Sequence, residues 1–159
     1  MISLNYNDNM SGCVECVCDF IIFKDGHKLV LNNSDKEFEL TKEKIKKIFQ
    51  QARVMPAFGV SLNHETQNAL KRGCWLQINF SHELEVNGLL FNALLFKLET
   101  TSGFNLIRLH DGQYEGRCIY LDFDEILDLK QIFNISWQNA FNDLKLYIVK
   151  YKRFYKLVK

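Results

Sequence analysis

Residues 74–123 read CWLQINFSHELEVNGLLFNALLFKLETTSGFNLIRLHDGQYEGRCIYLDF, and four strand-like segments in this stretch decide the fold. Asn87-Gly88 predicts a two-residue hairpin turn, because both central positions of such a turn require positive φ. Thr101-Ser102-Gly103 predicts a second short turn, and the connection from His110 to Gly116 is longer. Short connections favour antiparallel pairing of strands that follow one another in the chain. We therefore predict a meander of four strands, which span residues 74–86 (bulged near Ser81), 89–100, 104–110 and 117–123.

The second of these segments is apolar on both alternating sets of positions from residue 89 to residue 98. A strand with one side facing water alternates apolar and polar residues, whereas a strand covered on both sides does not. We therefore expect this segment to be a central strand of the sheet. The predicted core comprises Phe20, Ile22, Ile45, Phe49, Leu76, Ile78, Leu94, Phe96, Leu106, Ile119 and Leu121.

Before the meander, residues 14–23 alternate and predict a strand that places Cys16 and Cys18 on the core side with Phe20. Asp25-Gly26 then predicts a tight turn into a return strand over 28–32.

Two short helices are expected between this hairpin and the meander. One spans 42–53, with Thr41 as its N-cap and a short strand over 38–40 before it, and the other spans 64–72 with Asn63 as its N-cap. A basic, aromatic helix is expected over about 137–157. The fold class is therefore α+β: an antiparallel meander packed by short N-terminal and central helices and by a C-terminal helical segment, in a single domain spanning 1–159.

Composition limits the class of protein and its compartment. The chain has 159 residues, of which 47% are hydrophobic and 25% are charged, so it is predicted to fold as a globular protein. No apolar segment approaches the roughly 20 residues of a membrane span, and the first residues do not resemble a signal peptide. The cysteine count of five is odd, which suits a reducing compartment. We expect a cytoplasmic protein with no membrane span.

Charge is distributed unevenly along the chain. Residues 1–143 contain all 19 acidic and 14 of the 20 basic residues, a net charge of −5, whereas residues 144–159 contain six basic residues and a net charge of +6. Cations mixed with aromatic rings are typical of surfaces that bind single-stranded nucleic acid. The alternatives are a solvated stripe on a docked helix and a surface for an acidic protein. The candidate nucleic-acid-binding residues are Lys150, Lys152, Arg153 and Lys156.

The motif Cys13-x-x-Cys16-x-Cys18 has the spacing of half a zinc site. Zinc in structural sites needs four nitrogen or sulfur ligands, and the chain has no second Cys-x-x-Cys pair. Cysteine is also among the most buried residue types. We therefore interpret these residues as core thiols, and we assign neither a metal nor a cofactor.

The best local candidate for a binding site is the connection from His110 to Arg117, which also contains Asp111 and Tyr114. Functional groups concentrate in loops that rigid strands hold in place. The sequence does not fix a nucleophile, a base and an orienting group in relation to one another, so no catalytic residue is assigned. A second partner-binding candidate is Phe58, within the apolar connection between the two central helices.

Arg108 shares its side of the predicted strand with apolar residues. A buried arginine needs a partner, which Glu99 or Asp122 could supply; at the rim of the sheet its head would reach water instead.

The leading hypothesis is a small, non-enzymatic interaction protein whose partner is another protein, for example an accessory, inhibitor or immunity-type protein. The alternative is a nucleic-acid-binding module that uses the C-terminal helix. An enzyme with a site near His110 and Arg117 is the third hypothesis.

Overall fold

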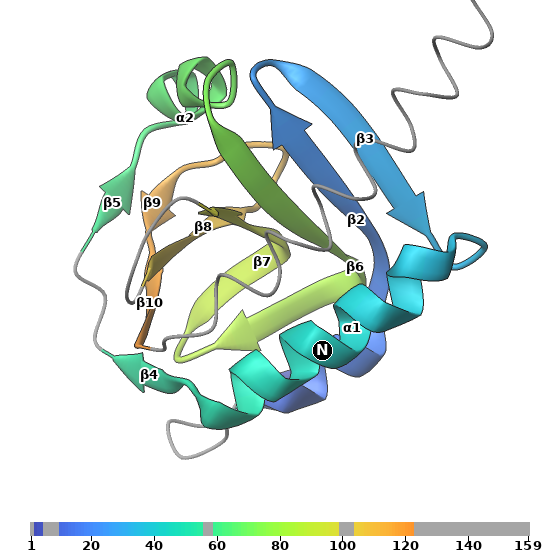
Figure 1. The fold of residues 1–159 in the computed structure, drawn as a ribbon. Helices are drawn as coiled ribbons and strands as arrows, with labels where there is room; N and C mark the ends of the chain where they lie inside the picture. The colour runs from blue at the N-terminus through green and yellow to red at the C-terminus, as the bar shows by residue number, and fades with distance from the viewer. Residues whose placement is uncertain (1, 5–9, 56–58, 99–103, 123–159) are drawn as a thin grey trace, which may run out of the picture.

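The computed structural model describes residues 2–4, 10–55, 59–98 and 104–122, and this part of the chain has an α+β fold (Figure 1). Its main sheet contains the seven strands β3-β2-β6-β7-β8-β10-β4 in that order, and β1 pairs in parallel with the end of β6. The described elements are β1 (Ile2–Leu4), the 3-10 helix η1 (Met10–Cys16), β2 (Val17–Lys24), β3 (His27–Asn32), α1 (Lys36–Gln51), β4 (Arg53–Met55), β5 (Val60–Ser61), α2 (Asn63–Ala69), β6 (Cys74–Val86), β7 (Leu89–Lys97), β8 (Phe104–Leu109), β9 (Gly116–Arg117) and β10 (Ile119–Asp122). The predicted C-terminal helix lies outside the described residues.

The predicted meander is confirmed, because β6, β7, β8 and β10 pair antiparallel in sequence order. Asn87 and Gly88 form the turn between β6 and β7 with φ values of 51° and 77°. The register of β6 against β7 shifts between Asn79 and Leu84, which is the predicted bulge. The last strand begins later than predicted, at Ile119, because residues 116–117 pair with β5 instead.

The strand β7 is covered on both faces, as its sequence predicts. Leu94 and Phe96 belong to the main core, which fills the space between the sheet, α1 and η1. Leu95 belongs to a smaller cluster with Leu70 and Trp75 on the opposite face, near α2. All of the predicted core residues are buried: Phe20, Ile22, Ile45, Phe49, Leu76, Ile78, Leu94, Phe96, Leu106, Ile119 and Leu121.

The N-terminal segment departs from its prediction. Residues Met10–Cys16 form η1, and the strand β2 starts only at Val17. A register shift between Val17 and Asp19 then reverses the alternation, so that Cys18 is exposed instead of facing the core with Phe20. The turn at Asp25-Gly26 is confirmed by φ values of 47° and 84°.

The helix α1 starts at Lys36, so the predicted strand over 38–40 and the predicted cap at Thr41 are wrong. Asp35 is the N-cap residue, and Thr41 lies inside the helix, where its Oγ1 donates a hydrogen bond to the Glu37 carbonyl over 2.6 Å. The reason is helical spacing, because Phe38 falls on the same apolar stripe as the later core residues. The buried positions of α1 are Phe38, Thr41, Ile45, Ile48 and Phe49.

None of the helices within the described ranges combines the length and the apolar character that a membrane crossing requires.

Candidate functional site

The His110–Arg117 connection folds as two parts. The first is a two-residue turn, in which His110 and Gln113 exchange backbone hydrogen bonds of 3.0 Å. The turn positions Asp111 and Gly112 have φ values of 49° and 74°, the conformation that the Asp-Gly pair favours. The second part is the segment from Tyr114 to Arg117, which contains β9 and leads into β10.

The His110 ring lies between two carboxylates. Its Nε2 is 2.9 Å from Oε2 of Glu83, and its Nδ1 is 3.6 Å from Oδ2 of Asp111. Glu83 belongs to the bulged part of β6, and its contact with a residue 27 positions away could not be predicted from local sequence. Both described polar contacts of the ring therefore go to acids, which orient the imidazole but supply no nucleophile.

Tyr114 is anchored at both its backbone and its side chain. Its N–H donates to Oδ1 of Asn63 over 2.9 Å, and its hydroxyl hydrogen-bonds to Oε1 of the buried Gln77. Gln77 in turn donates from Nε2 to Oδ1 of Asn79 over 2.8 Å, and Asn79 donates to Asp19 on β2. Burial raises the pKa of the Tyr114 hydroxyl. Tyr114 therefore fixes the Tyr114–Arg117 segment against the face of the sheet that lies opposite α1.

Arg117 lies beside the apolar connection between the helices. It is the cross-strand neighbour of Val60, because β9 and β5 pair antiparallel. The N–H of Cys118 also donates to the Gly59 carbonyl over 2.9 Å. Phe58 itself lies outside the described residues, but the residues that follow it adjoin the Tyr114–Arg117 segment. The fold thus brings together two regions that the sequence analysis treated separately.

A groove of about 350 Å³ lies between β5, α2 and the outer face of β8. Its lining is mixed and includes the apolar residues Val60, Leu62, Trp75 and Ile107 and the polar residues Glu65, Thr66 and Asn105. Val60 is 71% exposed and Leu62 is 50% exposed. We call Val60, Leu62 and this groove the β5 surface. Leu62 is not among the site residues predicted from the sequence, and no pattern in the sequence would have identified it.

The residue at the N-cap of α2 is Leu62, not the predicted Asn63, and no side-chain hydrogen bond caps this helix end. Ser, Thr, Asp and Asn are preferred at an N-cap because their oxygens accept hydrogen bonds from the free backbone N–H groups. Asn63 would fit that role, but it is the first residue of the helix and its oxygen is bonded to Tyr114. The prediction of Asn63 as the N-cap was wrong because its side-chain oxygen accepts a hydrogen bond from Tyr114 instead of from the helix.

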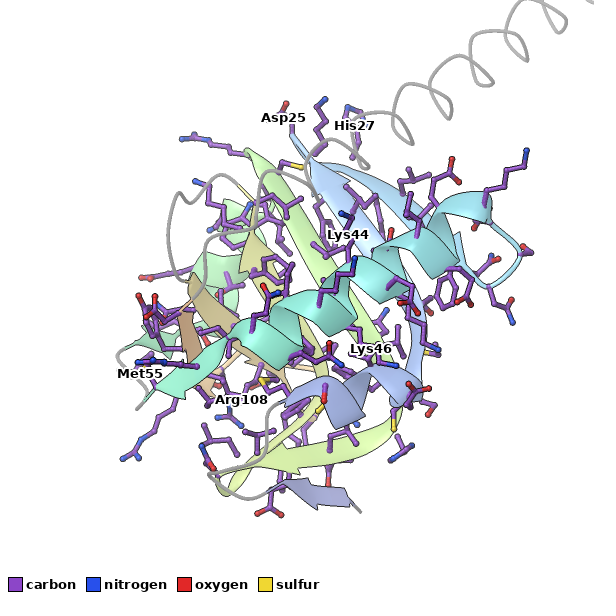
Figure 2. The ribbon with its side chains drawn as sticks, turned by 60° about the horizontal axis from the view of Figure 1, so that its bottom comes forward. Asp25, His27, Lys44, Lys46, Met55 and Arg108 are labelled. Atoms are coloured by element: carbon purple, nitrogen blue, oxygen red, sulfur yellow. The ribbon has the colours of Figure 1, made fainter. Side chains whose placement is uncertain are left out.

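Arg108, labelled in Figure 2, is half-buried and is bonded to backbone oxygens. Its Nε donates to the carbonyl of Arg117 and its Nη1 to the carbonyl of Leu90, both over 2.7 Å. Burial lowers the pKa of its guanidinium. Among the described residues, Asp122 is not paired with Arg108, and Glu99, the other predicted partner, lies outside the described residues. Arg108 thereby supports the chain at Arg117.

The three N-terminal cysteines occupy different environments. Cys13 is buried in the main core, Cys16 is half-buried at the end of η1, and Cys18 is exposed. The interpretation as core thiols therefore fits Cys13 but not Cys18. Within the described part of the chain, no group of three or more histidine, cysteine or acidic side chains is arranged to hold a metal ion. The candidate residues of the basic tail lie outside the described part.

Comparison of the chain with protein-family models, with curated proteins and with solved structures found no match.

Proposed function

We propose that the protein is a small, cytoplasmic, non-enzymatic interaction protein that binds another protein through the β5 surface. The observation that carries the proposal is the exposure of Val60 and Leu62 beside the groove. Two large apolar side chains that face water beside a groove with mixed apolar and polar lining fit an interaction site. The groove is large enough to receive one or two apolar side chains of a partner.

The connection that pairs with β5 carries charged residues. Arg117 is paired with Val60 across the β5–β9 ladder and is itself exposed. Asp111 and Glu115 are exposed on the same connection. An apolar centre with a charged rim is the usual composition of a protein–protein interface, in which the centre supplies affinity and the rim supplies orientation. His110, Asp111 and Arg117 are therefore proposed as rim residues, while Tyr114 positions the segment that carries them.

The N-cap of α2 adds a second line of support. An exposed leucine at this position leaves the helix end uncapped and gains little from burial. Natural sequences depart from such local preferences mainly at functional or strained sites. A partner that covers Leu62 would recover the burial that the free protein lacks.

The test compares the double variant Val60→Asp, Leu62→Asp with the control variant Leu40→Asp. Leu40 on α1 is 50% exposed, the same fraction as Leu62, and α1 and β5 lie on different sides of the fold (Figure 1). Because all three side chains are exposed, each variant should unfold at nearly the wild-type urea concentration. Aspartate at position 62 also provides the missing cap, which favours the folded state.

Tagged full-length protein is used for affinity capture from its native cell under reducing conditions. We expect one protein partner at a fixed ratio with the wild type and with Leu40→Asp, and a loss of at least tenfold with the double variant. Equal capture by the two variants would refute the β5 surface as the binding site. Capture that is abolished by ribonuclease or deoxyribonuclease would favour the nucleic-acid alternative.

A further inference from the structure

The helix η1 places two cysteines on one face. A 3-10 helix has three residues per turn and a rise of about 2.0 Å per residue, so side chains three positions apart lie directly above one another. Cys13 and Cys16 have this spacing, and both belong to η1. The same rise puts their Cα atoms roughly 6 Å apart, within the range of about 4.4–6.8 Å that a disulfide requires. The Cα spacing therefore suits a disulfide, and because eclipsed side chains keep their Cβ atoms about as far apart as their Cα atoms, the last turn of η1 must tighten for the Cβ atoms to reach the roughly 3.5–4.5 Å of a disulfide.

The two thiols differ in their access to solvent. Cys13 is only 1% exposed and packs in the main core, whereas Cys16, the last residue of η1, is half-buried. Burial, together with the neighbouring Cys16, raises the pKa of Cys13 to about 12. Cys13 is therefore a poor nucleophile in the reduced protein, since the thiolate is the reactive form.

Cys16 has a base next to it. Its Sγ is 3.7 Å from Nε2 of His82, and Nδ1 of the same ring is 3.0 Å from Oγ of Ser81. In the tautomer protonated at Nδ1, the ring donates to the Ser81 oxygen, and Nε2 is free to accept the proton of the Cys16 thiol. A thiol, a base and a residue that orients the base are the arrangement that activates a cysteine nucleophile.

From this geometry we infer that Cys13 and Cys16 form a reversible dithiol–disulfide couple, in which Cys16 is the attacking thiol and Cys13 the resolving thiol. The co-reactant is a low-molecular-weight disulfide of the glutathione type. This reactivity is independent of the β5 surface and would give the protein a thiol–disulfide exchange site in addition to its proposed binding role.

The exchange proceeds in two balanced steps. In the first step, His82 takes the proton of the Cys16 thiol, and the thiolate attacks one sulfur of the glutathione disulfide. A Cys16–glutathionyl bond forms as the S–S bond of the small disulfide breaks. The other glutathione leaves as a thiolate and takes up a proton. The Cys13 sulfur then attacks Sγ of Cys16, and its proton passes to the departing glutathione sulfur. The Cys13–Cys16 bond forms, and the second glutathione leaves as a thiol. The dithiol is oxidised by two electrons, and one small disulfide is reduced to two thiols.

The experiment uses reduced full-length protein in buffers of graded oxidised-to-reduced glutathione ratio, quenched with acid, alkylated and mapped by mass spectrometry. The wild type should lose two hydrogens through a Cys13–Cys16 bond. The matched control Cys18→Ser removes a more exposed thiol of the same segment and should reach half-oxidation at the same ratio. Cys13→Ser should stop at a stable glutathionyl adduct on Cys16, and Cys16→Ser should leave Cys13 unmodified.

One further variant tests the role of His82. His82→Ala should slow the oxidation of Cys16 several-fold at neutral pH while the same Cys13–Cys16 product forms. The disulfide map of the wild type decides the question even if Cys13→Ser folds poorly. A map with bonds to Cys18, Cys74 or Cys118 in place of the Cys13–Cys16 bond would overturn the inference, as would a wild type that remains reduced at every ratio.

Discussion

The side-chain oxygen of Asn63 accepts a hydrogen bond of 2.9 Å from the backbone N–H of Tyr114. This contact joins the start of α2 to the segment that follows the His110 turn, across 51 positions of sequence. Together with the β5–β9 ladder, it holds the apolar Val60 and Leu62 beside the charged residues of the connection. The arrangement of the candidate site therefore depends on the side-chain amide of Asn63 as well as on the residues that face solvent.

Replacement of Asn63 tests this dependence. Asn63→Ala removes the acceptor and leaves the half-buried N–H of Tyr114 unpaired, which should lower the free energy of unfolding by about 1–3 kcal/mol. Asn63→Asp keeps an oxygen at the same place and should retain most of the stability. Urea unfolding measures both. A loss for the aspartate variant as large as that for the alanine variant would show that the oxygen is not what position 63 contributes.

Leu94 tests the central strand. Its side chain is completely buried in β7, so Leu94→Ala should lower the free energy of unfolding by about 2–5 kcal/mol through lost transfer energy and the cavity that remains. The control is Leu40→Ala on α1, whose half-exposed side chain should change stability by less than about 0.5 kcal/mol. Equal effects of the two substitutions would be inconsistent with burial of Leu94 between β7 and the main core.

The sequence was most informative where a local requirement of the backbone or of burial met no competing tertiary contact. The Asn87-Gly88 and Asp25-Gly26 pairs predicted their turns, because positive φ at both positions is a local requirement. The apolar character of residues 89–98 was a second local signal, and it predicted a buried strand because a strand covered on both faces shows no alternation of apolar and polar residues. These features determined the meander and the core.

The errors lie where a tertiary contact competes with a local preference. Thr41 and Asn63 are good N-cap residues, yet Thr41 lies within the longer apolar stripe of α1, and Asn63 is bonded to Tyr114. The shift at Cys18 depends on the pairing of β2 with β6, which no local pattern encodes. The candidate site was predicted only in part for the same reason. The residue composition of the connection from His110 to Arg117 identified it as a candidate site. Its neighbours Val60 and Leu62 could not be identified in this way, because the pairing of β5 with β9 brings them next to it.

Alkaline pH should reveal the buried thiol. Burial raises the pKa of Cys13 to about 12, whereas an unfolded cysteine ionises near its ordinary value of about 8.5. Between these values the unfolded chain loses a proton that the folded protein keeps, so stability is fully present at lower pH and falls as pH rises.

The measurement is urea unfolding between about pH 8 and pH 10.5 in the presence of reductant, a range chosen to span the ionisation of the unfolded thiol. Cys13→Ala should flatten the pH dependence by up to roughly 1.4 kcal/mol per pH unit, whatever its effect on stability at neutral pH. Parallel curves for the variant and the wild type would show that Cys13 ionises as readily in the folded protein as in the unfolded one.

The basic tail provides a test against nucleic acid. Binding through Lys150, Lys152, Arg153 and Lys156 would release counterions, with a logarithmic salt slope of about −0.7 for each neutralised phosphate of a single strand. Under the protein-binding proposal, the full-length protein should show no salt-sensitive affinity for mixed-sequence RNA or single-stranded DNA near physiological ionic strength. Micromolar affinity that disappears when these four residues are replaced by glutamine would reverse the order of the two hypotheses.

The most direct test of the central claim is photocrosslinking at the β5 surface in the native cell. A benzophenone side chain is introduced at position 62 in one variant and at position 40 in another, since Leu62 and Leu40 are exposed to the same extent. We predict one discrete protein adduct from position 62 and none from position 40. The same adducts from both positions, or adducts to nucleic acid alone, would contradict the proposal that the β5 surface binds a protein partner.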